Sequence, residues 1–134
     1  MKIIDGKGAI LGRLASYVAK EALKGEEMIV LNCEEILISG NKKTTKDRFE
    51  QRRGRVGSGQ KGPKLGKTSE KMVKRSIRGM LPDHRMGRGR AAFKRIKCYN
   101  KIPSEFEDKK KILAGKEKPI KCSKVKEFAK WKQE

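Results

Sequence analysis

The positive charge of this chain is concentrated in its middle, and this uneven distribution limits where a hydrophobic core can form. Residues 1–41 contain five basic and six acidic residues, a net charge of −1. Residues 42–95 contain nineteen basic and four acidic residues, a net charge of +15, and residues 96–134 add +6. We therefore expect residues 1–41 to form a folded scaffold, residues 42–95 a charged contact surface built on it, and residues 104–134 a basic C-terminal extension of the same single domain, 1–134.

The scaffold segment predicts a strand, a helix and a second strand. Ile3 and Ile4 begin a short strand, and residues 28–33 have the composition of a buried one. Between them, apolar residues recur at helical spacing: Leu11, Leu14, Ala15, Val18, Ala19, Ala22 and Leu23. Gly25 is placed to end this helix in the left-handed conformation. A strand, helix and strand joined by short turns indicate parallel neighbouring strands. Residues 36–38 fit either a strand end or a turn.

The middle and the end of the chain predict further, less regular elements. A helix around residues 46–52 has Phe49 as its one apolar residue, and residues 53–66 predict a flexible glycine-rich loop. We expect a helix that begins at Thr68 or Ser69 and ends before Pro82, a short helix after Gly87, and a possible strand at 97–99. Val125, Phe128 and Trp131 have roughly the spacing of a last helix that packs on the body or on a neighbour.

Two segments resemble nucleotide-binding loops. GQKGPKLGKT, residues 59–68, ends like a P-loop, but Lys61 stands where the first glycine is required and no apolar strand precedes it. Near the N-terminus Gly6, Gly8 and Gly12 give G-x-G-x-x-x-G, one residue longer than the dinucleotide fingerprint. Glu34 and Glu35 stand where an acidic ribose partner is expected. Glycines required by the turn alone give the same letters, so this motif is weak evidence for an enzyme.

Composition indicates the class of partner. The chain has 134 residues, 35% hydrophobic content and a formal net charge of +20, which calls for a polyanion such as nucleic acid. No apolar run is long enough to span a membrane, and the opening residues do not resemble a signal peptide. Cys33, Cys98 and Cys122 are far apart and His84 is the single histidine, so we expect free thiols in a reducing cytoplasm and no metal site.

The basic region mixes arginine, whose planar fork suits phosphate, with lysine, which supplies point charge. Phe49 and Phe93 are its only aromatic residues, so recognition of folded RNA by backbone and shape is favoured over stacking of single-stranded bases. The candidate RNA-binding residues are Lys7, Arg13, Asn41, Lys42, Lys43, Lys46, Arg48, Arg52, Arg53, Arg55, Lys61, Lys64, Lys67, Lys71, Lys74, Arg75, Arg78, His84, Arg85, Arg88, Arg90, Lys94 and Arg95. Lys7 and Arg13 form a second candidate phosphate site near the first helix N-terminus.

Four segments together resemble the universal large-subunit ribosomal protein L-thirteen family, in its archaeal type. They are LGRLAS at 11–16, VLNCEEILISGNK at 30–42, IRGMLP at 77–82 and RMGRGRAAFKRIKCY at 85–99. The resemblance implies a three-layer α/β/α domain around a small parallel sheet of about four strands. It also implies binding to large-subunit (23S) ribosomal RNA during assembly and translation, contact with neighbouring ribosomal proteins, and a cytoplasmic location in the large, 50S-type subunit.

The same resemblance implies no catalysis, no cofactor, no small-molecule substrate and no self-association. Residues 53–67 and the chain beyond 103 match the family poorly, so the contacts expected there rest on composition alone. The alternative hypothesis is a nucleotide-dependent enzyme on a doubly wound sheet, which requires a phosphate loop at residues 6–12. A general basic condenser of nucleic acid, indifferent to RNA structure, is a third and weaker hypothesis.

Overall fold

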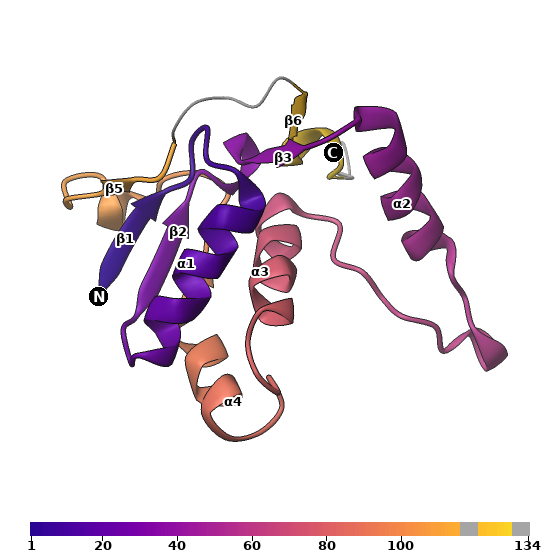
Figure 1. Ribbon diagram of the computed structural model, residues 1–134, viewed down its shortest axis with the longest axis horizontal. Helices are drawn as coiled ribbons and strands as arrows, with labels where there is room; N and C mark the ends of the chain where they lie inside the picture. Colours follow the sequence, from indigo (N-terminus) through magenta and orange to yellow (C-terminus); the bar gives the residue numbers. More distant parts are fainter. Residues whose placement is uncertain (116–120, 130–134) are drawn as a thin grey trace.

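The computed structural model describes residues 1–115 and 121–129 (Figure 1). Four strands form a parallel sheet in the order β4-β2-β1-β5, and two others form an antiparallel ribbon. The sheet strands are β1 Lys2–Asp5, β2 Met28–Leu31, β4 Ile96–Cys98 and β5 Ile112–Leu113. The ribbon pairs β3 Leu37–Ser39 with β6 Cys122–Lys124. The helices are α1 Leu11–Leu23, α2 Lys42–Gly54, α3 Ser69–Gly79 and α4 Gly87–Lys94.

The main core lies between one face of the sheet and helices α1, α3 and α4. Ile4 and Val30 face this side of the sheet, and Val18 of α1, Val73 of α3 and Ala92 of α4 pack against it with almost no exposure. The helical spacing of apolar residues in α1 therefore predicted most of its buried face correctly, whereas Leu23 at its end is 39% exposed and Glu21 is buried. Gly25, with φ +103°, ends this helix in the left-handed region as expected, and its N–H donates to the carbonyl of Ala22.

The opposite face of the sheet has a thinner cover. Ile3, Ile29 and Leu31 form a second cluster with Phe106, and Tyr99 and Ile102 pack at its edge. The covering segment contains a 3-10 turn at Ser104–Phe106 in place of a helix. The prediction of a single α/β domain around a four-stranded parallel sheet is confirmed, and the second outer layer consists of this one turn and its flanks.

Two elements differ from the expectations for the C-terminal part of the chain. β5 and β6 lie within the segment expected to be an extension, and each pairs with a strand of the N-terminal scaffold. Where a last helix was expected, the structure has a 3-10 turn at Val125–Glu127, while Trp131 lies outside the described residues. Of residues 36–38, undecided from the sequence, Leu37 and Ile38 belong to β3.

Helix α2 stands away from the sheet (Figure 1). It runs from Lys42 to Gly54, longer than the expected 46–52, because the side chain of Asn41 accepts a hydrogen bond from the N–H of Lys43 at 2.9 Å and caps its first turn. None of its residues is buried. After α2 the chain follows an extended course back to α3, and we call residues 55–67 the strap.

Candidate nucleic-acid interface

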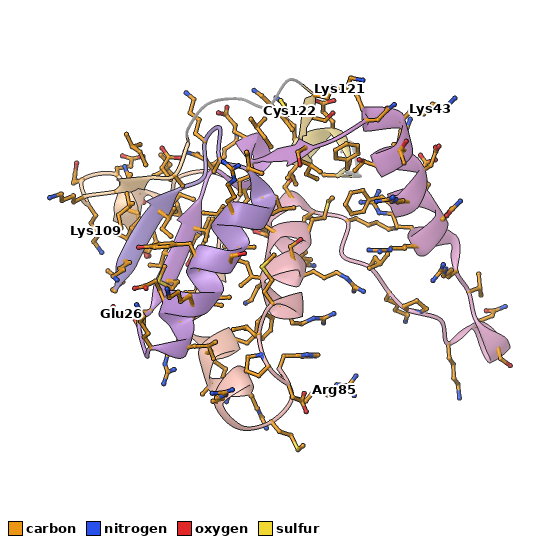
Figure 2. All side chains as sticks on the ribbon, viewed as in Figure 1. Glu26, Lys43, Arg85, Lys109, Lys121 and Cys122 are labelled. Carbon is orange, nitrogen blue, oxygen red and sulfur yellow. The ribbon has the colours of Figure 1, made fainter. Side chains whose placement is uncertain are left out.

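The candidate RNA-binding residues lie on elements that surround one side of the domain. α2 carries Lys42, Lys43, Lys46, Arg48, Arg52 and Arg53; the strap carries Arg55, Lys61, Lys64 and Lys67; α3 carries Lys71, Lys74, Arg75 and Arg78; and the turn and helix that follow carry His84, Arg85, Arg88, Arg90 and Lys94. In Figure 2, Lys43 lies near the start of α2 and Arg85 in the turn before α4, and they mark two ends of this basic surface. Lys109 lies at the far side of the sheet.

These cations are almost entirely without acidic partners. Of the 21 lysines and arginines among the candidate residues, Lys42 alone forms an ion pair within residues 1–115 and 121–129, and its partner is Glu127. The other ion pairs described involve the N-terminus, Lys2 and Lys24, which belong to the scaffold. Because the positive charges of this surface have almost no acidic partners, they attract polyanions. Their mutual repulsion destabilises the fold when no polyanion is bound.

Three arginines line a cleft of about 210 Å³ between α2 and α3. Arg52 and Arg53 of α2 and Arg75 of α3 line the cleft. Gly66 and Gly79 also line it and have no side chains to fill it. Partial burial lowers the pKa of the Arg75 guanidinium, and the positive charges of Arg78 and Arg52 lower it further. Such mutual repulsion is relieved by a bound anion, and arginine forks match the geometry of phosphate oxygens.

Arg53 has an internal role as well. Its Nη2 donates to the carbonyl oxygen of Phe128 at 2.7 Å, and its guanidinium lies 5.6 Å from the ring centroid of Phe49. The rings of Phe49 and Phe128 are 5.5 Å apart. With the Lys42–Glu127 pair, these contacts attach α2 to the 3-10 turn at Val125–Glu127. Because α2 buries no residue of its own, its position depends on this attachment.

The positioning residues Glu127 and Phe128 were not among the sequence-predicted site residues. The spacing of Val125 and Phe128 indicated that this segment packs against something, and the structure identifies α2 and the main core as what it contacts. Hydrogen bonds from the Lys42 ammonium and from the backbone N–H of Lys124 hold the pKa of the Glu127 carboxyl below its ordinary value.

Glycines shape the strap. Gly57 and Gly59 have φ of +71° and +61°, which side-chain-bearing residues rarely adopt, and the N–H of Gly62 donates to the carbonyl of Val56 at 2.5 Å. Lys61, Lys64 and Lys67 are all exposed. No buried strand leads into GQKGPKLGKT, and one of the amides a P-loop would aim at phosphate is used to close this local turn. The rejection of a P-loop therefore agrees with the geometry.

The α3–α4 side of the surface is organised around Phe93. The ammonium of Lys74 lies 5.0 Å from the ring centroid of Phe93, and the His84 ring meets the same side chain edge-on at 6.3 Å. Arg95 contacts the scaffold: its Nη1 donates a hydrogen bond to the carbonyl of Ala22, near the end of α1, at 3.4 Å. Asn100 caps α3 by accepting from the N–H of Glu70 at 2.9 Å, whereas Thr68 at the N-cap position makes no side-chain cap bond.

The second candidate phosphate site, with Lys7 and Arg13, adjoins a turn whose amides are occupied. The N–H groups of Gly6, Gly8 and Ala9 donate to carbonyls of Leu31, Glu35 and Gly6, and the N–H of Lys7 donates to Asp5. A Cβ on Gly6 would lie 2.8 Å from the Ile36 side chain and 2.9 Å from the Leu31 oxygen. Close packing thus explains this glycine, and a dinucleotide would find none of these four amides free. Lys7 and Arg13 are both exposed.

Other chemistries find little support. Cys33, Cys98 and Cys122 are free thiols, as expected, and a hydrogen bond with Cys98 together with burial raises the pKa of Cys33. Within the part of the chain that the structure describes, no three His, Cys, Asp or Glu side chains come together as metal ligands. None of the helices described there combines the length and the apolar character needed to cross a bilayer.

Comparisons with known proteins identify the family of this basic domain. The family model described as ribosomal protein L13 matches residues 1–105. The large ribosomal subunit protein uL13 of Methanosarcina barkeri is 45% identical over 113 residues, which are 84% of this chain and 79% of that protein. The protein of the same description from Methanosphaera stadtmanae is 39% identical over 129 residues, which are 94% of this chain and 90% of that one. The relative from Thermoplasma volcanium is 42% identical over 110 residues, 82% of this chain and 79% of its own. The chain therefore belongs to the ribosomal protein L13 family.

Proposed function

We propose that this chain is a structural constituent of the large ribosomal subunit that binds and stabilises folded large-subunit rRNA during assembly and translation. The coarser part of this statement follows from the family, which is one of structural ribosomal components and not of enzymes. Its place of action is accordingly the large subunit in the cytoplasm. Binding to rRNA and contact with neighbouring ribosomal proteins are the finer parts, which the geometry of the basic surface supports.

The arginine cleft between α2 and α3 carries the proposal. Arg52 and Arg75 bring two guanidinium groups to its walls, and no carboxylate within the described residues pairs with either. A backbone phosphate in this cleft would accept hydrogen bonds from both helices at once. The strap lysines Lys61, Lys64 and Lys67 would neutralise flanking phosphates without reading sequence.

The aromatic residues of the basic region favour recognition of RNA shape. Phe49 is covered by Phe128 and Arg53, and Phe93 by Lys74 and His84. Both rings are half-buried and already in contact with other side chains, which leaves less of each for a single-stranded base to stack on. We therefore propose that the protein binds a folded RNA surface through its phosphates, with specificity from the arrangement of the cations on α2, the strap, α3 and α4.

Footprinting tests this proposal. The full chain is bound to folded large-subunit rRNA, and backbone cleavage by hydroxyl radicals is mapped with and without protein. Protection confined to a few backbone segments that adjoin in the folded RNA is the expected result. Uniform weak protection along the RNA would instead support the general nucleic-acid condenser and contradict shape recognition.

A further inference from the structure

In addition to the basic surface, the structure has an apolar groove at the β5 edge of the sheet. It has a volume of about 400 Å³ and lies between α1 and the edge strand β5. Its lining residues are Ile4, Ile10, Arg13, Leu14, Tyr17, Ile112, Leu113 and Ala114. Arg13 is the one charged residue among them.

The register of the sheet explains why this groove is open. Ile112 of β5 is aligned with Ile4 of β1, so both side chains face the α1 side of the sheet. Ile4 is 1% exposed because α1 covers it, whereas Ile112 is 43% exposed because no helix of residues 1–115 or 121–129 lies over β5 (Figure 1). Tyr17 of α1, on the other wall of the groove, is 42% exposed. An α/β sheet ordinarily has its faces covered, so the layer is incomplete at this edge.

The charge around the groove restricts what completes it. Arg13, the one charged side chain that lines the groove, has no carboxylate partner within the residues described. A second copy of the chain also carries a net charge of +20, so the two copies repel each other. RNA supplies the negative charge but not the aliphatic side chains that the isoleucine and leucine lining would bury.

We propose that this groove binds an apolar segment of a neighbouring large-subunit protein, and that an Asp or Glu of that segment pairs with Arg13. In the described part of the chain β5 is the edge strand of the sheet, and such an edge offers backbone hydrogen bonds to an extended segment. This assigns Arg13 to a protein contact and leaves the basic surface of α2, the strap, α3 and α4 to RNA. The inference rests on the proposed residence in the large subunit and adds a protein-docking site to it.

Photo-crosslinking from the groove tests the proposal in assembled subunits. Tyr17 of α1, which lines the groove and is exposed, is replaced by p-benzoylphenylalanine; subunits containing the full chain are purified and irradiated, and the crosslinked species are sequenced. We expect a crosslink to one ribosomal protein, in a peptide that contains apolar residues and at least one Asp or Glu. Crosslinks to rRNA, to a second copy of this chain, or to nothing would each overturn the proposal.

A matched pair of variants strengthens the test. Ile112→Glu places a carboxylate on the groove floor and should reduce the crosslink more than tenfold, because an apolar partner would have to bury that charge. Leu23→Glu makes the same kind of change at an exposed apolar residue of α1 outside the groove, and should leave the crosslink unchanged. Equal crosslinking in both variants would contradict docking in the groove.

Affinity of the isolated chain for rRNA separates the two proposals. Ile112→Glu should bind folded rRNA as the unchanged protein does, since β5 lies outside the basic surface. If the chain binds rRNA but gives no protein crosslink, only the proposal of protein docking in the groove is contradicted. A chain that gives the crosslink but does not prefer rRNA contradicts the RNA proposal alone.

Discussion

The guanidinium of Arg53 donates a hydrogen bond to the backbone carbonyl of Phe128, at 2.7 Å, across 75 residues of sequence. This contact joins the basic helix α2 to the C-terminal segment that pairs, through β6, with the scaffold. An isolated 13-residue helix rich in lysine and arginine is marginal in water, so the geometry of the proposed RNA surface depends on such contacts.

Arg53→Ala should loosen α2 without unfolding the domain. The variant loses a charge-assisted hydrogen bond, which typically contributes about 1.5–3 kcal/mol, and the contact with the Phe49 ring. Amide hydrogen exchange in α2 should accelerate about tenfold or more. Arg52→Ala removes the same charge from an exposed neighbour and should leave the exchange of α2 nearly unchanged. Equal acceleration in the two variants would show that α2 is not held through Arg53.

Arg52→Ala and Arg75→Ala should each weaken RNA binding and reduce its salt dependence. Each variant removes one proposed phosphate contact, so the slope of log affinity against log salt should fall by about 0.7–0.9. Binding titrations at several salt concentrations measure this slope. Lys20→Ala, on the exposed face of α1, is the control and should keep the original slope. If the arginine variants keep it too, the α2–α3 cleft is not the interface.

Gly6→Ala should destabilise the domain by about 1–3 kcal/mol, because its Cβ would overlap the Ile36 side chain and the Leu31 carbonyl. Gly12→Ala is the matched control: no atom lies within 4 Å of its Cβ position, and alanine favours helix α1 by up to about 1 kcal/mol. Urea unfolding of both variants gives the comparison. If Gly6→Ala keeps full stability, close packing does not explain this glycine.

Stability should decline in acid partly through Glu21. Hydrogen bonds from the ammonium groups of Lys2 and Lys24 lower the pKa of this carboxyl from 4.5 to about 2. Since the folded pKa is the lower one, the ionised carboxylate stabilises the fold above pH 4.5, and that contribution is lost as the pH falls from 4.5 toward 2.

The urea concentration at the midpoint of unfolding, measured at pH 7, 4, 3 and 2, reports the loss of the stabilisation by Glu21. Glu21→Gln has no such proton to bind, so its stability should change less over the same range. Parallel decline of the two proteins would mean that other carboxyl groups account for the acid sensitivity.

The sequence predicted the scaffold well because its elements bury continuous apolar faces. The helical spacing from Leu11 to Leu23 and the apolar run at Met28–Leu31 each correspond to an element of the structure. The loop at 53–66 was predicted from its glycines, and two of them adopt positive φ. The resemblance to the L13 family supplied the sheet size that the pattern alone did not give.

Short strands were missed for a physical reason. β5 has two residues and β6 has three, too few to display a period, and each forms only by pairing with a strand about 85–110 positions earlier. The attachment of α2 was likewise invisible, because it joins Arg53 and Phe49 to Phe128 through one carbonyl and one pair of rings. For the same reason the sequence did not distinguish Arg53 and Arg95 from the other basic residues, although both donate hydrogen bonds to backbone carbonyls.

The most direct test of the central claim is equilibrium binding of the full chain to folded large-subunit rRNA and to an unrelated RNA of equal length, across a range of salt. Preference for the rRNA should persist at moderate salt, because the proposed arrangement of cations on α2, the strap, α3 and α4 matches one folded surface. Equal affinities that fall together as salt rises would contradict it, since charge alone would then explain binding.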